Sequence, residues 1–105
     1  MKRVITILTL LFFQNIYAQG EYIERGNNAY AAGALDVKTK EMLGLVASMV
    51  LRCDDCIKYH LGKSHEAGVT TEQVYEVFAI ANLVGGSICI PHTRRAAEYW
   101  QALIE

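Results

Sequence analysis

Two thiols and an imidazole that could assist them follow one another at intervals of three and four residues: Cys53, Cys56 and His60. An α-helix turns about 100° per residue, so this spacing places all three on one stripe of a helix. Two sulfurs at this separation can form a disulfide, and an imidazole one turn away can hydrogen-bond a sulfur or take its proton. The cluster therefore predicts thiol–disulfide redox chemistry.

The residues alone do not identify which sulfur is the nucleophile. Cys53 lies nearer the expected helix start, where the helix dipole stabilises a thiolate, whereas His60 is placed one turn after Cys56. Asp54 and Asp55 oppose both assignments, because nearby carboxylates disfavour a thiolate. Both cysteines therefore remain candidates on this evidence.

Two other uses of the cysteines are compatible with the sequence. A structural disulfide between Cys53 and Cys56 would close a loop so short that it removes little chain entropy. A zinc site built from these cysteines and His60, with Cys89 or His92 as a further ligand, lacks a clear second ligand pair. Either use would make the chain a non-catalytic helical module. Unless it is a zinc ligand, Cys89 is expected to be a lone, buried, small apolar residue.

The N-terminal segment has the layout of a secretory signal. Positive residues at 2 and 3 precede an apolar run over residues 4–13, which is well short of the roughly 20 apolar residues that span a bilayer. Small Ala18 predicts cleavage before Gln19, with residues 1–18 as the signal peptide and residues 19–105 as the mature domain. We therefore expect an exported protein, periplasmic or secreted, whose cysteines meet an oxidising environment. The alternative is an apolar N-terminal helix packed on the domain.

Length and composition limit the class of protein. The chain has 105 residues, enough for one domain, and 52% hydrophobic residues with a single proline describe a packed globular fold. Ten basic residues stand against eleven acidic ones, with no basic cluster larger than Arg94-Arg95. This charge pattern excludes nucleic-acid binding.

Apolar periodicity and capping residues predict an all-α domain. Asp36 is a suitable helix N-cap, and Thr70 with Gln73 forms a capping-box pattern. No turn signal of a β-hairpin separates alternating runs anywhere in the chain. About five helices are expected, over residues 21–32, 38–51, 53–67 and 71–83 and after Pro91.

The expected helix over residues 38–51 is apolar around most of its circumference. A small domain has too few neighbouring elements to cover such a helix, so the pattern predicts that subunits associate. Glu41 lies on this helix, either as a buried functional acid or as the exposed end of its first turn.

The order and spacing of these motifs resemble the AhpD-like alkylhydroperoxidases of the carboxymuconolactone decarboxylase superfamily. The resemblance covers roughly residues 34–97. It is carried by residues 35–43, by the stretch from Arg52 to His60, by residues 66–70, by Gly85-Gly86 and by His92. It implies an AhpD-like helical domain that assembles into a trimer or hexamer.

The resemblance also implies a mechanism. Cys56 would attack a hydroperoxide or disulfide substrate, Cys53 would resolve the resulting sulfenic acid, and Glu41 with His60 would relay the proton. A thiol electron donor would restore the pair, without cofactor or metal. The decarboxylase branch lacks the cysteine pair, so decarboxylation is not expected. Asp55 departs from the pattern, because the best-known peroxidase members carry a histidine there.

Overall fold

A computed structural model describes residues 1–11, 14 and 29–105, which fall into two units, Met1–Ala31 and Ala32–Glu105. Residues 2–11 of the first unit are helical. The second unit is built of helices, and the described residues contain no strand, which confirms the prediction of an all-α fold. Its elements are α2 (Val37–Val50), α3 (Asp54–Glu66), α4 (Thr71–Gly85), the 3-10 turn η1 (Ser87–Cys89) and α5 (Ile90–Ile104).

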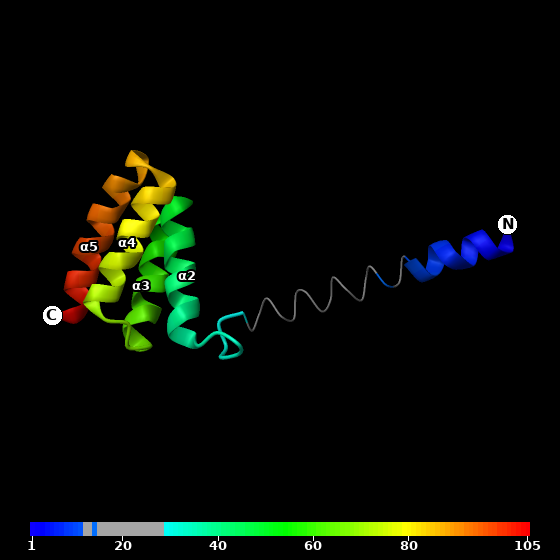
Figure 1. Ribbon diagram of the computed structural model, residues 1–105, viewed down its shortest axis with the longest axis horizontal. Helices are drawn as coiled ribbons and strands as arrows, with labels where there is room; N and C mark the ends of the chain where they lie inside the picture. Colours follow the sequence, from blue (N-terminus) through cyan, green and yellow to red (C-terminus); the bar gives the residue numbers. More distant parts are fainter. Residues whose placement is uncertain (12–13, 15–28) are drawn as a thin grey trace. The chain divides into compact units, whose positions relative to one another are not determined.

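The four long helices form a bundle in which each contacts two neighbours. α2 packs against α3 and α4, and α5 packs against the same two helices. The chain runs up and down, so the α2–α3 and α4–α5 connections lie at the same end of the bundle (Figure 1). This topology brings the first turn of α3 close to the first turn of α5.

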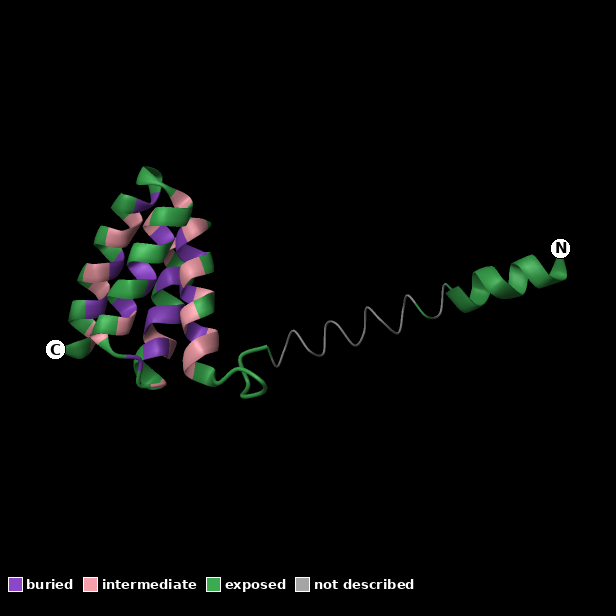
Figure 2. Ribbon diagram, viewed as in Figure 1, coloured by how far each residue is buried: buried purple, intermediate pink, exposed green. Residues whose placement is uncertain are grey.

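Residues of all four helices form one buried cluster. Figure 2 colours the buried positions of each helix purple. Trp100 is buried, and its indole N–H donates a hydrogen bond to the Thr71 hydroxyl at 3.1 Å. The core consists of Leu45, Met49, Ile57, Leu61, Val69, Val74, Val77, Phe78, Ala81, Ala96 and Trp100.

The predicted caps are confirmed. The Asp36 carboxylate accepts the Thr39 N–H at 2.7 Å at the start of α2. At α4, Thr70 and Gln73 exchange both hydrogen bonds of a capping box. These contacts satisfy backbone donors that have no partner within the helix, which is why the helix starts follow the sequence signals.

The turn between α2 and α3 has glycine-like backbone geometry without a glycine. Arg52 has φ 59°, its N–H donates to the Met49 carbonyl, and the Cys53 N–H donates to the Ser48 carbonyl. These two bonds define a Schellman motif, whose left-handed position usually holds glycine. The turn ends α2 and delivers Cys53 to the N-cap of α3.

Two predicted boundaries near α5 were wrong. α4 continues through Gly85, two residues beyond the expected end, and stops where Gly86 has φ 80°. α5 begins at Ile90 rather than after Pro91, because a proline in the first turn needs no helical N–H partner. The turn η1 was not expected. It seats Cys89 against Gly85, at which any Cβ would overlap the cysteine sulfur.

The predicted helix over residues 21–32 lies mostly outside the described residues. Its described end, residues 29–32, forms turns and bends instead. All four of these residues are exposed, so little surface is buried there to offset the entropy cost of ordering a helix.

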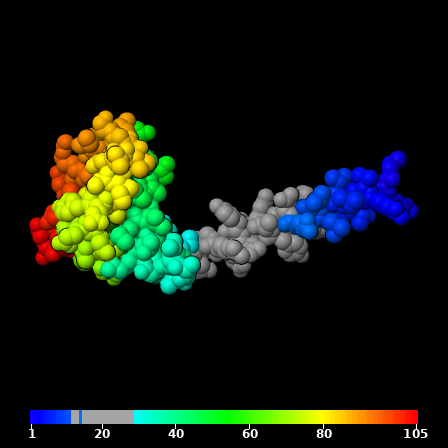
Figure 3. All heavy atoms as spheres, in the orientation of Figure 1, coloured from blue at the N-terminus to red at the C-terminus, as the bar shows by residue number. Residues whose placement is uncertain are grey.

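The surface between α2 and α4 is mainly apolar, with Thr39, Gln73 and Glu76 among the residues that line its groove. Leu43 and Ile80 are each about half exposed beside a groove of about 250 Å³, and Leu83 and Val84 are more exposed still. Figure 3 shows α2 and α4 side by side on the face in view. No helix in the described part of the chain is long and apolar enough to cross a membrane.

Candidate functional site

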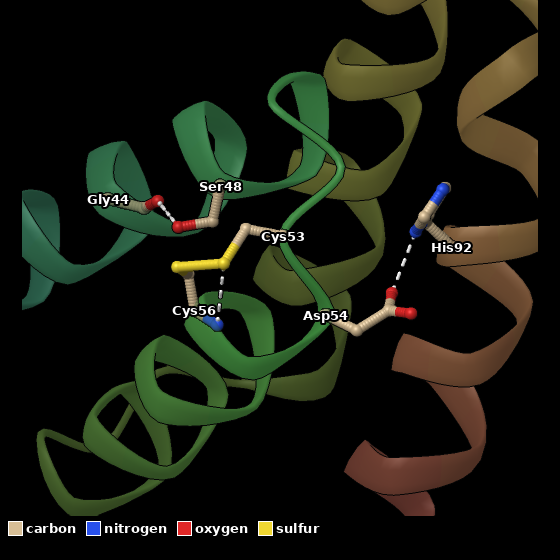
Figure 4. The surroundings of a disulfide bond; sticks show 6 residues. All are labelled: Gly44, Ser48, Cys53, Asp54, Cys56 and His92. Carbon is tan, nitrogen blue, oxygen red and sulfur yellow. Dashed lines mark hydrogen bonds and ion pairs between the residues drawn. A yellow bond between two sulfur atoms is a disulfide. The ribbon is translucent and has the colours of Figure 1, made fainter.

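Cys53 and Cys56 are joined by a disulfide at the N-terminus of α3 (Figure 4). Their Cα atoms lie 5.2 Å apart, and the Cys53 sulfur caps the helix by accepting the Cys56 N–H at 3.3 Å. Cys56 is exposed, whereas Cys53 is half-buried. Cys89 is a free, buried cysteine whose thiol donates to the Met49 carbonyl at 3.5 Å, so the predicted division of the three cysteines is confirmed.

The end of α2 supports the disulfide from one side. Ser48 is buried, lies beside the sulfurs in Figure 4, and donates its hydroxyl to the Gly44 carbonyl at 2.7 Å. Its own carbonyl accepts the Cys53 N–H at 3.1 Å. Backbone contacts therefore hold Cys53 in place, and Cys56 is the more exposed of the two cysteine residues.

Glu41 and His60 form a buried pair between α2 and α3. The Glu41 Oε2 lies 2.9 Å from the His60 Nδ1, and the two side chains are only 5% and 11% exposed. Of the two expectations for Glu41, the buried acid is therefore the one that the structure shows. His60 follows Cys56 by one turn of α3, so an acid–imidazole pair lies on the stripe of the helix that carries the exposed residue Cys56.

A second acid–imidazole contact joins the first turn of α3 to α5. The Asp54 Oδ1 lies 2.7 Å from the His92 Nδ1, and Arg95 donates to the Asp54 Oδ2 from Nε at 3.2 Å and from Nη2 at 3.0 Å. Figure 4 shows the Asp54 carboxylate turned toward His92 and away from the disulfide. The His92 hydrogen bond, with Arg95 adding to it, holds the pKa of Asp54 below its ordinary value.

This second contact was missed in the sequence, where Asp54 is expected to disfavour the thiolate together with Asp55. Asp54 is instead engaged by two residues that lie 38 and 41 positions further along the chain. Asp55 is exposed. The only sequence signal for the contact is that His92 and Arg95 are three residues apart, and therefore on one face of a helix.

Other candidate residues fall outside the site. His65 is exposed and lies edge-on to the Trp100 ring, with 5.9 Å between centroids. Within the described ranges, no three His, Cys, Asp or Glu side chains gather closely enough to hold a metal ion. The zinc site considered from the sequence is therefore not assembled in this arrangement.

Comparison with known proteins identifies the fold. The sequence profile of the Carboxymuconolactone decarboxylase family matches residues 19–99. A solved family member from Thermotoga maritima is 48% identical, with a TM-score of 0.74 over 83% of this chain and 90% of that one. An apo structure of a family member from Legionella pneumophila is 23% identical and has the same fold, with a TM-score of 0.73 over 99% of this chain and 93% of that one.

Two further bacterial proteins are similar in sequence. The protein called uncharacterized protein 4 in cox locus, from Paracoccus denitrificans, is 30% identical over 67 residues, or 64% of this chain. An uncharacterized protein of Cupriavidus necator is 31% identical over 71 residues, or 68% of this chain. The matched regions span 60% and 63% of the lengths of these two relatives. Profile, structure and the motifs around Cys53 and Cys56 agree, and the chain belongs to the carboxymuconolactone decarboxylase family, with the cysteine pair of its AhpD-like members.

Proposed function

We propose that the chain is a thiol–disulfide oxidoreductase of the AhpD-like type, which reduces hydroperoxides or disulfides through Cys53 and Cys56. The observation that carries the proposal is the buried Glu41–His60 pair, one helical turn from the exposed residue Cys56. A structural disulfide needs no acid–base pair beside it, whereas a reacting thiol does. The Thermotoga maritima relative, for which an involvement in the antioxidative response has been suggested, supports the same class of activity.

The proposed cycle starts from the reduced pair. The Cys56 thiolate attacks one peroxide oxygen, the O–O bond breaks, and the other oxygen takes a proton and leaves as an alcohol. Cys56 then carries a sulfenic acid; the Cys53 sulfur attacks it, the S–S bond forms and water leaves. An external dithiol donor supplies the two electrons and two protons that restore both thiols.

Each residue has a distinct role in this cycle. Cys56 is the better nucleophile by access, because it is exposed while Cys53 is half-buried. Glu41 and His60 supply and remove protons, and the 2.9 Å contact fixes the imidazole ring for that purpose. When the donor attacks Cys56, Cys53 is the leaving sulfur, and its thiolate is favoured by the Cys56 N–H and the helix N-terminus.

Two cysteine variants test the assignment. Cys56→Ser should abolish consumption of an organic hydroperoxide and leave no sulfenic acid to trap with dimedone. Cys53→Ser should form a trappable sulfenic acid at Cys56 and then stall. If Cys56→Ser consumes the hydroperoxide at the normal rate, the assignment is wrong.

The alternative of a structural disulfide in a non-catalytic module is tested by the reduction potential. Structural disulfides lie below about −300 mV, while working pairs are more oxidising. We expect a potential above this limit for Cys53–Cys56. A more negative value, together with no peroxide consumption, would favour the structural alternative.

We also propose that the chain forms a homo-oligomer, a trimer or a multiple of it. The apolar α2–α4 surface around Leu43 and Ile80 supports association, because contiguous exposed apolar patches are uncommon on monomers. Light scattering should show an assembly that Ile80→Lys weakens and that Ile104→Lys, an exposed apolar position on another helix, leaves intact. A monomeric parent protein at micromolar concentration would refute association.

Export is a further proposal, based on the sequence of residues 1–18. Intact-mass analysis of protein from its native host should show a chain beginning at Gln19. Soluble mature protein that retains Met1 would disprove cleavage.

A further inference from the structure

The first turn of α3 carries a charged cluster that the proposed cycle does not use. Both oxygens of the Asp54 carboxylate are occupied, one by the His92 imidazole and the other by two nitrogens of Arg95. The Arg95 Nη2 also lies 3.1 Å from the His92 Nδ1. The cluster is therefore a three-residue clamp, formed by Asp54, His92 and Arg95, across the contact of α3 with α5.

The position of Asp54 makes this clamp relevant to the sulfurs. Asp54 follows the N-cap Cys53 directly and precedes Cys56 by two residues. A free carboxylate in the first turn is attracted by the positive end of the helix dipole, which is also where a cysteine thiolate would be stabilised. A carboxylate and a thiolate at one helix N-terminus would repel each other, and the thiol pKa would rise.

The structure shows the opposite arrangement. The Asp54 side chain is turned to the α5 side, away from the disulfide (Figure 4). Arginine remains charged at all ordinary pH values, so Arg95 offsets the carboxylate charge whether or not His92 is protonated. The lowered pKa of Asp54 is consistent with this pairing.

We propose that Arg95 and His92 are positioning residues for the redox pair, which hold Asp54 away from the cysteine sulfurs and thereby favour thiolate formation. The proposal rests on redox use of the disulfide. It assigns a role to α5, which supplies no sulfur, acid or base to the proposed cycle. The role is electrostatic: the clamp keeps one carboxylate of the Cys-Asp-Asp-Cys motif from opposing the thiolate.

The test is a titration of the Cys56 thiol by thiolate absorbance. A Cys53→Ser, Cys89→Ala background leaves Cys56 as the one thiol of the chain, since the sequence has three cysteines. In this background Arg95→Gln should raise the pKa of Cys56, so that about threefold less thiolate is present below that pKa, as expected for one unpaired charge several ångströms away in a solvated site. Arg94→Gln is the matched control, because the exposed Arg94 makes no contact with Asp54 in the structure; it should leave the pKa unchanged.

A double variant separates the clamp from general effects of losing a cation. Asp54→Asn removes the charge that the clamp restrains, so Arg95→Gln should have no further effect on the Cys56 pKa in that background. Arg95→Lys keeps the positive charge, so it should raise the pKa of Cys56 less than Arg95→Gln does. If Arg95→Gln matches the Arg94→Gln control, or if its effect persists with Asn at position 54, the proposal is wrong.

Folding and activity are measured separately. Helical circular dichroism and thermal unfolding should be nearly unchanged in Arg95→Gln, because the ion pair is partly exposed. If Arg95→Gln does not fold, His92→Asn replaces it in the same titration, with the same expected direction. The thiol pKa does not depend on peroxide consumption, so a protein that never forms sulfenic acid would refute the proposed function while leaving this test decisive for the clamp.

Discussion

Helix α3 takes part in two carboxylate–imidazole contacts of similar length, one on each side. The Glu41–His60 pair faces α2 and is buried, with an N···O distance of 2.9 Å. The Asp54–His92 pair faces α5, measures 2.7 Å, and leaves the aspartate side chain 41% exposed. Arg95 is added to the second pair.

The difference shows how the same two functional groups can serve different purposes. Arg95 keeps its charge, so it favours the ionised form of Asp54 and makes the α5 contact an element of fixed charge. Burial makes separated charges costly, so the α2 contact is suited to a proton that changes sides during a reaction. These environments fit the roles that we propose, proton transfer for the buried pair and electrostatic positioning for the partly exposed Asp54–His92 pair.

The largest expected effect follows from breaking the buried pair. His60→Ala and Glu41→Gln should each slow sulfenic acid formation at Cys56 by about a hundredfold or more, the usual range for loss of a general acid or base. The measurement is the rate of reaction between reduced protein and an organic hydroperoxide. His65→Ala is the control on the same helix, and a rate for His60→Ala equal to that of the control would remove the proton relay.

The same pair should also matter for folding. Glu41→Leu places an apolar side chain of similar size at this buried position but removes the partner of the His60 Nδ1, so we expect a loss of about 1–3 kcal/mol in unfolding free energy. Urea denaturation measures this loss. Glu66→Leu, on the exposed face of α3, should change stability little. Equal losses for the two variants would contradict the argument that the buried hydrogen bond of Glu41 stabilises the fold.

A smaller effect is expected at the turn that presents Cys53, between the two pairs. Arg52 occupies a left-handed conformation with φ 59°, which costs a non-glycine residue about 1–2 kcal/mol. Arg52→Gly removes this cost in the folded state, but glycine also raises the entropy of the unfolded chain, which opposes folding. The balance is an expected net stabilisation of about 0.5–1 kcal/mol. Arg52→Val should destabilise the protein, because a β-branched side chain fits this region poorly. A gain in melting temperature with valine would disprove the argument.

The smallest effect concerns the partly exposed Asp54–His92 pair and its contribution to stability at acidic pH. The pKa of Asp54 is lowered from 3.8 by His92 and Arg95, so its contribution to stability is present above pH 3.8 and is lost as the pH falls through the lower value of the folded protein. Arg95→Gln should weaken this dependence, which a series of melting temperatures from pH 5 to pH 2 would reveal. Identical acid profiles for the parent protein and this variant would show that the pair contributes nothing measurable.

Local patterns in the sequence were sufficient for the four helices between Val37 and Ile104 and for the disulfide. The caps at Asp36 and Thr70 and the pairing of Cys53 with Cys56 all involve residues three apart in the chain. Contacts of this range depend on the geometry of one helical turn, so residue types and spacing predict them. The end of α4 and the start of α5 were less predictable, because the α4–α5 connection is shaped by packing of Cys89 against Gly85.

Contacts between helices were decided by the tertiary structure. The burial of Glu41 against His60, 19 residues away, and the capture of Asp54 by His92, 38 residues away, depend on how α2 and α5 are placed beside α3. The sequence left Glu41 open between two environments and did not indicate that Asp54 is paired with His92 and Arg95. A helical pattern states which residues share a face, but the neighbour of that face, and hence its dielectric environment and charge partners, is set only when the helices pack.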